Sequence, residues 1–495
     1  MMKARGIEKS GILSAIISNK WLVVVLFLKG FLIAPSLFAD MPRTFADLVA
    51  KVSPAVVNIS TIQSIEDIST HNFFDFTFPP GSPFEDYFHE FGLPDGDTNK
   101  GTQQRIGLGS GFIIDPNGYV VTNYHVIKDA QAIQVTLNNG MQYEASLIGV
   151  DQRTDIAVLK IETRQSLVFV QLGDSDKARV GDWIVAVGNP FGLGGSVTVG
   201  VLSARGRDIQ SGPFDDFLQL DAAINRGNSG GPSFNLEGEV IGINTAIYSP
   251  NGGSVGIGFA IPSNVAKPII TALKEKGAVE RGWLGVQIQP VTPEISEAVG
   301  LSRAQGALII SVQPNSPAAR AGLLASDVIT AVNQQAIIEM RDLPKLIASI
   351  APGKKINLSV WRDQKTISIT IELGRLEDPQ TNVSLSPIIV KKPLISNDNQ
   401  ILEGASLSSL NVEFRQRFNI ADQTKGVGIT DVKASSLSAS QGLKKGDVIV
   451  QVGQKRITSL AELEMAIQNA KSAKKSAILL LINRQGSETF LAFKF

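Results

Sequence analysis

The chain has 495 residues, which is too long for one hydrophobic core, because single cores rarely grow past about 250–300 residues. Its 46 basic and 46 acidic residues cancel, so no overall field attracts nucleic acid or an anionic membrane. The chain contains no cysteine, which excludes disulfides, thiolate metal sites and a cysteine nucleophile. We therefore expect several domains and no nucleic-acid partner.

The N-terminus resembles an export signal. A basic lead precedes an apolar stretch over residues 21–39, which is close to the roughly 20 residues that span a bilayer. Lys29 and Pro35 interrupt this stretch. We expect residues 1–39 to form a signal peptide cleaved after Ala39, with an uncleaved membrane anchor as the alternative.

From residue 107 onward the sequence predicts mostly strands. A D-P-N-G turn joins strands 107–114 and 119–123, and an N-N-G turn joins strands 132–137 and 141–148, so two hairpins are expected. Further short strands are expected at 156–161, 183–188, 197–204, 239–246 and 256–261. A helix is expected over residues 263–276, and the following glycine ends it. Many short strands with Gly-rich turns indicate barrels or sandwiches.

A long loop over residues 65–105 contains an aromatic-rich run at 71–92. This run has no clean helix or strand period. A loop with this many aromatic residues is suited to an intersubunit contact, a regulatory role or a lid. The alternative is that it packs on its own domain.

Three residues at strand edges form a candidate catalytic group. His125 follows strand 119–123 in the stretch TNYHVI, Asp155 precedes strand 156–161, and Ser229 lies in the stretch INRGNSGGP. The chain order His, Asp, Ser is that of chymotrypsin-type proteases. A serine hydroxyl needs a base to take its proton, and histidine titrates near neutrality. A carboxylate fixes the imidazole tautomer.

The glycines around Ser229 suit an oxyanion hole, which needs backbone N–H groups aimed at developing negative charge with no side chain in the way. The N–H groups of Gly227 and Ser229, with Asn228 between them, are the candidates. A flexible surface turn is the alternative for a Gly-rich segment.

The C-terminal half contains an internal repeat. Residues 307–333 match residues 427–453 at a constant offset of 120. Two copies are too few for a solenoid, so they predict two small globular modules. The polar segment 376–399 between them suits a linker. Within the repeat, Ser326 stands where the second copy has Gly446.

The stretches TNYHVI, TDIAVLK, GNPFGLGGSVTVG and DAAINRGNSGGP resemble the HtrA family of serine proteases, and the layout resembles its DegP/DegQ type. The likeness covers residues 45–495. It implies a mainly β fold, with a chymotrypsin-like double β-barrel followed by two small α+β PDZ domains. By this resemblance His125 is the base, Asp155 orients it and Ser229 is the nucleophile.

The resemblance also implies the division of the chain. It places the protease domain at 40–278, the first PDZ domain at 280–375 and the second at 400–495. Family members are periplasmic, ATP-independent proteases that degrade misfolded or unfolded proteins and have chaperone activity. The implied partners are unfolded proteins, their C-terminal peptides and two further copies of the chain in a homotrimer, with larger cages and a peripheral membrane association left open.

No cofactor or metal is expected. The sequence has no phosphate-binding loop of the form GxxxxGK[ST], so ATP is not implied.

Two sets of binding residues follow from the resemblance. Ala223 stands six residues before Ser229, where trypsin-like enzymes that select Lys or Arg carry an acid. A short apolar S1 pocket that prefers Val, Ala or Ile is therefore expected. Its walls are predicted to come from Ile241, Gly242, Ile243, Asn244 and Thr245. The family's carboxylate-binding loop is matched by Trp283, Leu284, Gly285 and Val286.

Peptide binding is expected at the first repeat, whereas the second has only Leu-Glu-Gly-Ala at 402–405, so binding there is doubtful. Residues 188–196 resemble the family's activation loop and residues 205–217 its sensor loop, which suggests an order–disorder switch. A holding chaperone and a PDZ peptide-binding adaptor remain as competing functions.

Overall fold

The computed structural model describes residues 44–64, 104–189, 195–225, 227–249, 254–377, 401–473 and 475–495. The chain divides into two compact units, Met1–Lys51 and Val52–Phe495. The described part of the first unit holds most of helix α2 (Ala46–Val52). The predicted signal peptide, the aromatic run 71–92 and nearly all of the predicted linker lie outside the described residues. Within the described ranges, no helix has the length and apolar character needed to cross a membrane.

Six antiparallel strands close into a first barrel. In order around the barrel they are β1 (Val56–Ser64), β2 (Gln104–Ile113), β3 (Tyr119–Thr122), β6 (Ile156–Ile161), β5 (Gln142–Asp151) and β4 (Ala132–Thr136). Both predicted hairpins are present, because β2 pairs with β3 and β4 with β5. A short 3₁₀ turn, η1 (Ser53–Ala55), precedes β1. The interior is filled by aliphatic side chains that alternate along the strands.

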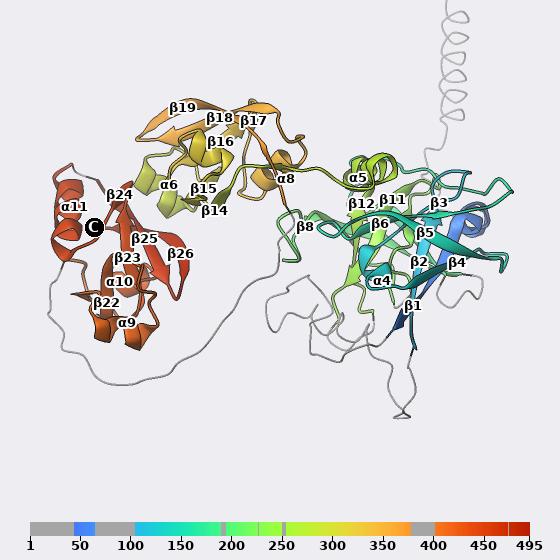
Figure 1. Cartoon of the computed structure of the whole chain (residues 1–495), viewed down its shortest axis with the longest axis horizontal. Coiled ribbons are helices and arrows are strands. Elements are labelled where there is room, and N and C mark those ends of the chain that lie inside the picture. The colour runs from blue at the N-terminus through green and yellow to red at the C-terminus, as the bar shows by residue number, and fades with distance from the viewer. Residues whose placement is uncertain are drawn as a thin grey trace, which may run out of the picture. The chain divides into compact units, whose positions relative to one another are not determined.

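A second barrel of six strands follows. Its order is β10 (Pro232–Phe234), β11 (Val240–Ile247), β12 (Gly258–Pro262), β9 (Phe217–Leu220), β8 (Ser196–Arg207) and β7 (Trp183–Gly188). The expected mainly β, double-barrel fold is thereby confirmed, although the sequence did not predict β1, β9 or β10. Figure 1 shows both barrels in blue to green and the two C-terminal repeats in yellow to red.

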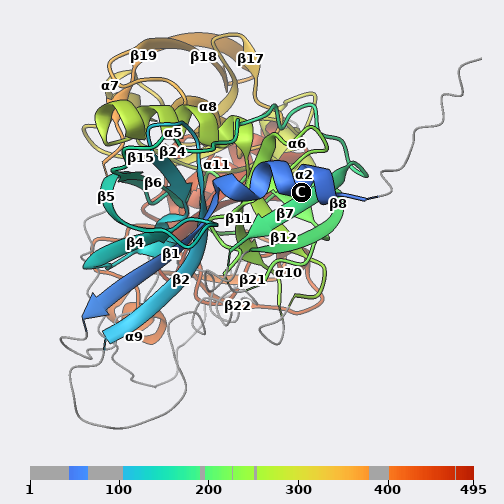
Figure 2. The same ribbon diagram turned by 90° about the vertical axis from the view of Figure 1, so that its right-hand side faces the viewer.

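Helix α5 (Ser263–Lys276) has the bounds predicted from the sequence. It ends because Gly277 adopts φ 72° and its N–H bonds the carbonyl of Leu273 at 2.9 Å, a left-handed cap that favours glycine. The helix packs on β5 and β6 of the first barrel and on β11 and β12 of the second (Figure 2). It therefore joins the two barrels along one side.

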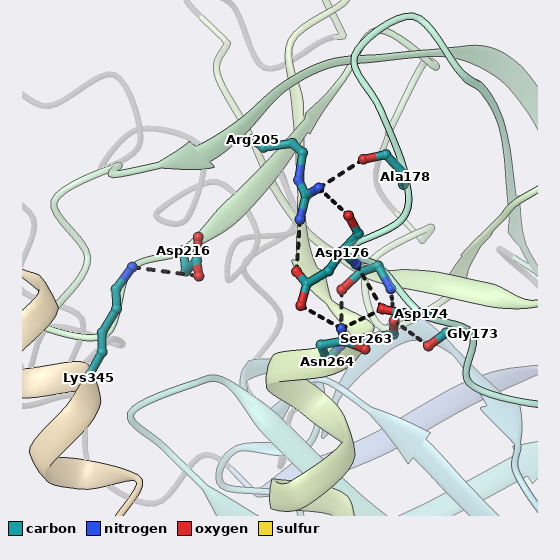
Figure 3. Close-up of polar contacts among 10 residues, drawn as sticks. Gly173, Asp174, Asp176, Ala178, Arg205, Asp216, Ser263, Asn264 and Lys345 are labelled. Atoms are coloured by element: carbon teal, nitrogen blue, oxygen red, sulfur yellow. Dashed lines mark hydrogen bonds and ion pairs between the residues drawn. The ribbon is translucent and has the colours of Figure 1, made fainter. Parts of the chain in front are cut away.

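A polar cluster fixes the start of α5 (Figure 3). The Asn264 Nδ2 group donates to Asp174 Oδ1 at 2.7 Å and to Asp176 Oδ2 at 2.8 Å. The bond from Asn264 holds the pKa of the exposed Asp174 carboxyl below its usual value. Arg205 of β8 pairs with Asp176 at 2.9 Å and also donates to the carbonyl of Ala178. The end of β8, which leads into residues 208–216, is thus tied to the helix start.

The two C-terminal repeats fold alike. The first sheet has the order β14 (Val286–Pro290), β15 (Ala307–Val312), β16 (Val328–Val332), β18 (Lys355–Arg362), β19 (Lys365–Glu372), with β17 (Gln335–Ala336) beside β16. The second has β21 (Ala405–Ser409), β22 (Val427–Val432), β23 (Val448–Val452), β25 (Ala477–Arg484), β26 (Ser487–Lys494), with β24 (Lys455–Arg456) beside β23. A two-stranded sheet, β13 (Gly282–Trp283) and β20 (Gly374–Arg375), flanks the first repeat.

Each repeat also carries three helices in matching places. They are α6 (Pro293–Val299), α7 (Pro317–Arg320) and α8 (Asp342–Ala348) in the first repeat, and α9 (Val412–Phe418), α10 (Leu437–Ser440) and α11 (Leu460–Ser472) in the second. Both repeats bury one aspartate against one arginine. Asp327 accepts two bonds from Arg362, at 2.7 and 2.6 Å, and Asp447 accepts two from Arg484, at 2.7 and 2.8 Å. These carboxylates raise the pKa of each arginine.

Candidate active site

The structure brings His125 and Asp155 together. His125 lies in the short helix α4 (Tyr124–Ile127), which starts two residues after β3. Its Nδ1 lies 2.6 Å from Asp155 Oδ2, and its backbone N–H donates to Asp155 Oδ1 at 2.9 Å. Both side chains are nearly buried, at 3% and 4% exposure. The carboxylate accepts the Nδ1 proton, so the imidazole presents Nε2 as its basic nitrogen.

An unusual backbone conformation places the Asp155 carboxylate. Asp155 adopts φ 57°, a left-handed conformation that costs a non-glycine residue about 1–2 kcal/mol. Its carbonyl accepts bonds from Asn123 Nδ2 at 2.9 Å and from the Tyr124 N–H at 3.2 Å. Asn123 Nδ2 also donates to Thr245 Oγ1 at 3.1 Å, in the second barrel. Sequence reasoning did not single out Asn123, because it closes a predicted strand and its partner Asp155 lies 32 residues away in the chain.

Ser229 is fully buried in the turn that leads into β10. Among the described residues, its Oγ has no hydrogen-bond partner. The next residue, Gly230, lies against Thr122 and Asn123, shortly before His125. A Cβ on Gly230 would come within 2.3 Å of Thr122 Oγ1 and 3.1 Å of the Asn123 nitrogen. The turn that carries Ser229 is therefore seated on the same segment that carries His125.

Packing requires two of the glycines around Ser229, and the backbone conformation also favours glycine at Gly230. Gly230 has φ 82°, and a Cβ there would lie 2.2 Å from the carbonyl oxygen of Ser110. A Cβ on Gly231 would lie 2.6 Å from the carbonyl oxygen of Val187. The sequence favours an oxyanion hole as the reason for these glycines, with a flexible surface turn as the alternative. The structure adds that the turn is wedged between strands of both barrels, which leaves no space for side chains.

The expected pocket residues 241–245 lie on β11 and are all buried. Thr245 lines a cavity beside His125 together with Ala246 and Ile261, which the sequence analysis did not name. Asn244 pairs with the serine turn: its carbonyl accepts from the Gly230 N–H at 2.8 Å.

The other expected pocket residues lie earlier in the same strand. Ile241 packs in the hydrophobic core of the second barrel. Gly242 and Ile243 pair with β10 and β12, so they belong to the barrel wall.

The expected sensor loop is shorter than predicted, because β8 continues to Arg207 and the loop proper spans 208–216. Asp215 holds it together by accepting bonds from the Ile209 N–H at 3.0 Å, the Ser211 N–H at 2.9 Å and Ser211 Oγ at 2.6 Å. Burial raises the pKa of the Asp215 carboxyl. Of the expected activation loop, residues 190–194 lie outside the described ranges.

A groove lies at the expected carboxylate-binding loop of the first repeat. Trp283, Leu284, Gly285 and Val286 line a cavity of about 350 Å³. Apolar residues of β14 and α8 line it as well, and so do residues 212–215 of the loop before β9. Gly285 adopts φ 81° at the bend of this loop.

The loop before β9 also contacts the first repeat directly. Lys345 of α8 lies 3.6 Å from Asp216 (Figure 3), and Arg341 Nη1 donates to the carbonyl of Gly206 at 3.0 Å. Arg281, which precedes the groove, makes a two-bond pair with the buried Asp151, with contacts of 2.7 and 2.5 Å. The ring of Phe214 stacks 5.1 Å from the same guanidinium.

The described residues include no group of three or more His, Asp or Glu side chains arranged to hold a metal ion. A buried imidazole–carboxylate pair, a buried serine and a Gly-rich turn with backbone N–H groups form the parts of an acyl-transfer centre.

Comparison with known proteins places both halves of the chain. A family model described as a trypsin-like peptidase domain matches residues 109–243, and a PDZ-domain model matches residues 282–373 and 410–490. A Brucella suis protein named probable periplasmic serine endoprotease DegP-like is 46% identical over 469 residues, covering 90% of this chain and 89% of its own. A Bartonella henselae protein of the same name is 43% identical over 475 residues, covering 93% and 91%.

A solved structure described as the HtrA-type protease AlgW with decapeptide is also similar. It is 39% identical, has a TM-score of 0.56, and its match covers 68% of this chain and 100% of that chain.

Proposed function

Since the chain belongs to the HtrA family of serine endopeptidases, with one trypsin-like domain and two PDZ domains in the DegP-like layout, we propose that it degrades unfolded exported proteins with Ser229 as the nucleophile. The observation that carries the proposal is the 2.6 Å contact between His125 Nδ1 and Asp155 Oδ2, beside the turn that holds Ser229. No cofactor takes part in this account.

The proposed reaction uses these three side chains in turn. Ser229 Oγ attacks the peptide carbonyl while His125 Nε2 takes the hydroxyl proton, and Asp155 stabilises the resulting imidazolium. His125 then gives this proton to the leaving amine, and a water molecule hydrolyses the acyl-enzyme by the reverse route. The N–H groups of Gly227 and Ser229, on either side of Asn228, stabilise the oxyanion. Loss of one such donor typically slows the reaction about 100- to 1,000-fold.

We assign an apolar specificity to the substrate pocket. Ala223 brings no charge to the position six residues before the nucleophile, and Thr245, Ala246 and Ile261 border the cavity beside His125. A short apolar pocket of this kind accepts Val, Ala or Ile and discriminates only weakly among them.

The first PDZ domain regulates the protease in this proposal. Backbone N–H groups of the Trp283–Val286 loop hold the terminal carboxylate of a peptide, and the open edge of β14 pairs with its backbone. Residues 212–215 border the same groove, and Asp216 pairs with Lys345, so an occupied groove changes the surroundings of the loop before β9.

The remaining parts of the proposal concern organisation. The protease domain spans 40–278 and the PDZ domains 280–375 and 400–495, with a linker at 376–399. The protein acts in the periplasm after export, as the names of its relatives suggest. It assembles as a homotrimer, and it also holds unfolded proteins as a chaperone.

The test compares cleavage of unlabelled casein by the wild type and by Ser229→Ala, with and without a peptide that ends in apolar residues. We expect cleavage by the wild type alone, faster with the peptide. Suppression of aggregation should survive in Ser229→Ala. Equal cleavage by both proteins contradicts the assignment of the nucleophile, and cleavage indifferent to the peptide contradicts regulation through the groove.

A further inference from the structure

The hydroxyl of Ser110 lies in a buried hydrogen-bond chain that reaches the serine turn. Ser110 belongs to β2 of the first barrel and is fully buried. Its Oγ accepts from the backbone N–H of Asn189 at 2.8 Å and donates to the carbonyl of Gly227 at 2.5 Å. One serine hydroxyl offers a donor and two acceptor lone pairs, so it makes both bonds at once. The direction of both bonds is fixed, because an N–H only donates and a carbonyl only accepts.

The backbone of Ser110 holds the same turn at a second point. Its N–H donates to the carbonyl of Ser229 at 2.9 Å, and its own carbonyl accepts from Thr122 Oγ1 at 2.8 Å. A single residue of the first barrel therefore holds the carbonyls on both sides of Asn228. The peptide unit between Asn228 and Ser229 carries one of the two proposed oxyanion donors.

Further backbone bonds hold the rest of the turn. The Asn228 N–H donates to the carbonyl of Asn225 at 3.0 Å, and the Gly231 N–H donates to the carbonyl of Asn228 at 3.0 Å. The Gly227 carbonyl, by contrast, depends on a side chain. If the Ser110 hydroxyl is absent, a buried carbonyl and a buried N–H lose this partner together, which is unfavourable.

The other end of the chain lies at the start of the segment that resembles an activation loop. Asn58 Nδ2 donates to the carbonyl of Asn189 at 3.0 Å, and the Gly195 N–H donates to Asn189 Oδ1 at 3.2 Å. The preceding residue packs on the turn itself, since a Cβ on Gly188 would lie 2.1 Å from Asn228 Oδ1. The position of Asn189 is therefore linked to the oxyanion turn through the Ser110 hydroxyl.

We propose that Ser110 is a positioning residue for the nucleophile turn, whose hydroxyl couples the segment beginning at Asn189 to the Gly227–Asn228 peptide unit, which lies between the two proposed oxyanion donors. The inference rests on the proposed role of Ser229 as nucleophile. It predicts that loss of the hydroxyl impairs transition-state stabilisation and leaves substrate binding intact, because Ser110 lies behind the turn and is fully buried.

The test measures kcat and KM on a short apolar peptide substrate and the rate at which a fluorophosphonate modifies the enzyme. For Ser110→Ala we expect kcat to fall about 10- to 100-fold, less than the roughly 100- to 1,000-fold for a lost donor itself, with KM unchanged. Fluorophosphonate modification should slow by a similar factor. Ser110→Cys nearly keeps the size of the side chain but has a weaker hydrogen-bond donor, so its kcat should lie between those of the wild type and Ser110→Ala. This variant replaces Ser110→Ala in the test if Ser110→Ala fails to fold.

The matched control is Ser175→Ala. Ser175 is equally buried, and its Oγ accepts from the Asn264 N–H at 3.1 Å at the start of α5, away from the serine turn. The control should keep the wild-type kcat even if its unfolding midpoint falls. Equal losses of kcat in Ser110→Ala and Ser175→Ala, or a loss confined to KM, overturn the inference.

A second control separates this inference from the proposed function. If Ser229→Ala is inactive and Ser110→Ala is as fast as the wild type, only the inference about Ser110 fails. If Ser229→Ala is still modified and still cleaves peptides, the proposed nucleophile is wrong and the inference fails with it.

Discussion

In the first PDZ domain the groove-facing side chains Val286 and Ile288 of β14 are half-buried, whereas their counterparts on β21 are covered, with Ala405 at 4% and Leu407 at 1% exposure. The covering element is α11, which has 13 residues and packs against β21. Its counterpart α8 has 7 residues and borders an open groove.

The backbone does not account for this difference. Gly285 and Gly404 have φ 81° and 82° at the same bend, and their carbonyls accept equivalent bonds at 2.9 Å from Gln313 and Lys433. The loop Leu-Glu-Gly-Ala therefore has the backbone shape of the loop in the first repeat without an open groove next to it. Side-chain packing between the helix and the strand, and not the backbone, therefore decides which copy has an open groove beside this loop.

Both PDZ domains contain the same buried pair of an aspartate and an arginine. Removing the arginine should destabilise each domain to the same extent, and this is the largest expected effect. Arg362→Met and Arg484→Met each leave a buried aspartate without its partner, which costs about 3 kcal/mol, the lower end for buried pairs, because both guanidinium groups reach solvent. Chemical denaturation, combined with hydrogen exchange followed separately in each PDZ domain, measures the loss in free energy of unfolding. A loss in only one domain would show that the two frameworks are not equivalent.

The grooves should respond differently. Ile288→Glu puts a charge into the apolar groove of the first domain, and the affinity for a peptide with an apolar C-terminus should fall about 30-fold, equivalent to roughly 2 kcal/mol. Gln287→Glu adds the same charge at the neighbouring position of β14, which is exposed and accepts a bond from Ser311, and should bind normally. Titration calorimetry measures both. Equal weakening by the two variants would contradict the location of the site.

One position that differs between the copies should give a smaller, reciprocal effect. Ser326 has φ 73° where the second domain has Gly446 at φ 91°. Ser326→Gly should stabilise the first domain by about 1 kcal/mol, because a left-handed serine is strained. Gly446→Ser should destabilise the second, because its Cβ would lie 2.7 Å from Phe418 Cδ1. Urea midpoints of the two variants should shift in opposite directions; shifts of the same sign would contradict the account.

The smallest expected effect concerns the loop that borders only the first groove. Burial raises the pKa of Asp215 in the folded protein, so the folded loop binds this proton more tightly than the unfolded chain. The stabilisation is complete below the unfolded pKa of about 3.9 and is lost as pH rises through the folded value. Asp215→Asn removes this titration, so its unfolding midpoint should rise relative to the wild type between low pH and neutrality. A difference that does not change with pH would contradict the burial argument.

Much of the fold could be predicted because its signals are local. Strands β6 and β7 and helix α5 have the predicted bounds, since unbroken apolar runs and a glycine stop mark their ends. Strands β9 and β10 have only 4 and 3 residues, too short for a period to emerge from Gly-rich sequence.

Some residues of the candidate site could likewise be predicted from local sequence, and others could not. His125, Asp155 and Ser229 could be proposed from residue type and chain order, and the structure brings the first two together. Ser110 and Asn123 could not, because their roles consist of bonds to residues far away in sequence. A serine within a predicted strand carries no local sign of such a bond. The sequence predicts a pocket wall from five consecutive residues, 241–245. Successive side chains of a strand point to opposite faces, and Ile241 points into the core of the second barrel.

The most direct test of the central claim is to find the residue that a fluorophosphonate modifies, by peptide mapping and mass spectrometry of the labelled protein. The account predicts a single adduct on Ser229 in the wild type, and none anywhere in Ser229→Ala or after unfolding. An adduct on another serine, or one that persists in Ser229→Ala, would contradict the assignment of the catalytic centre.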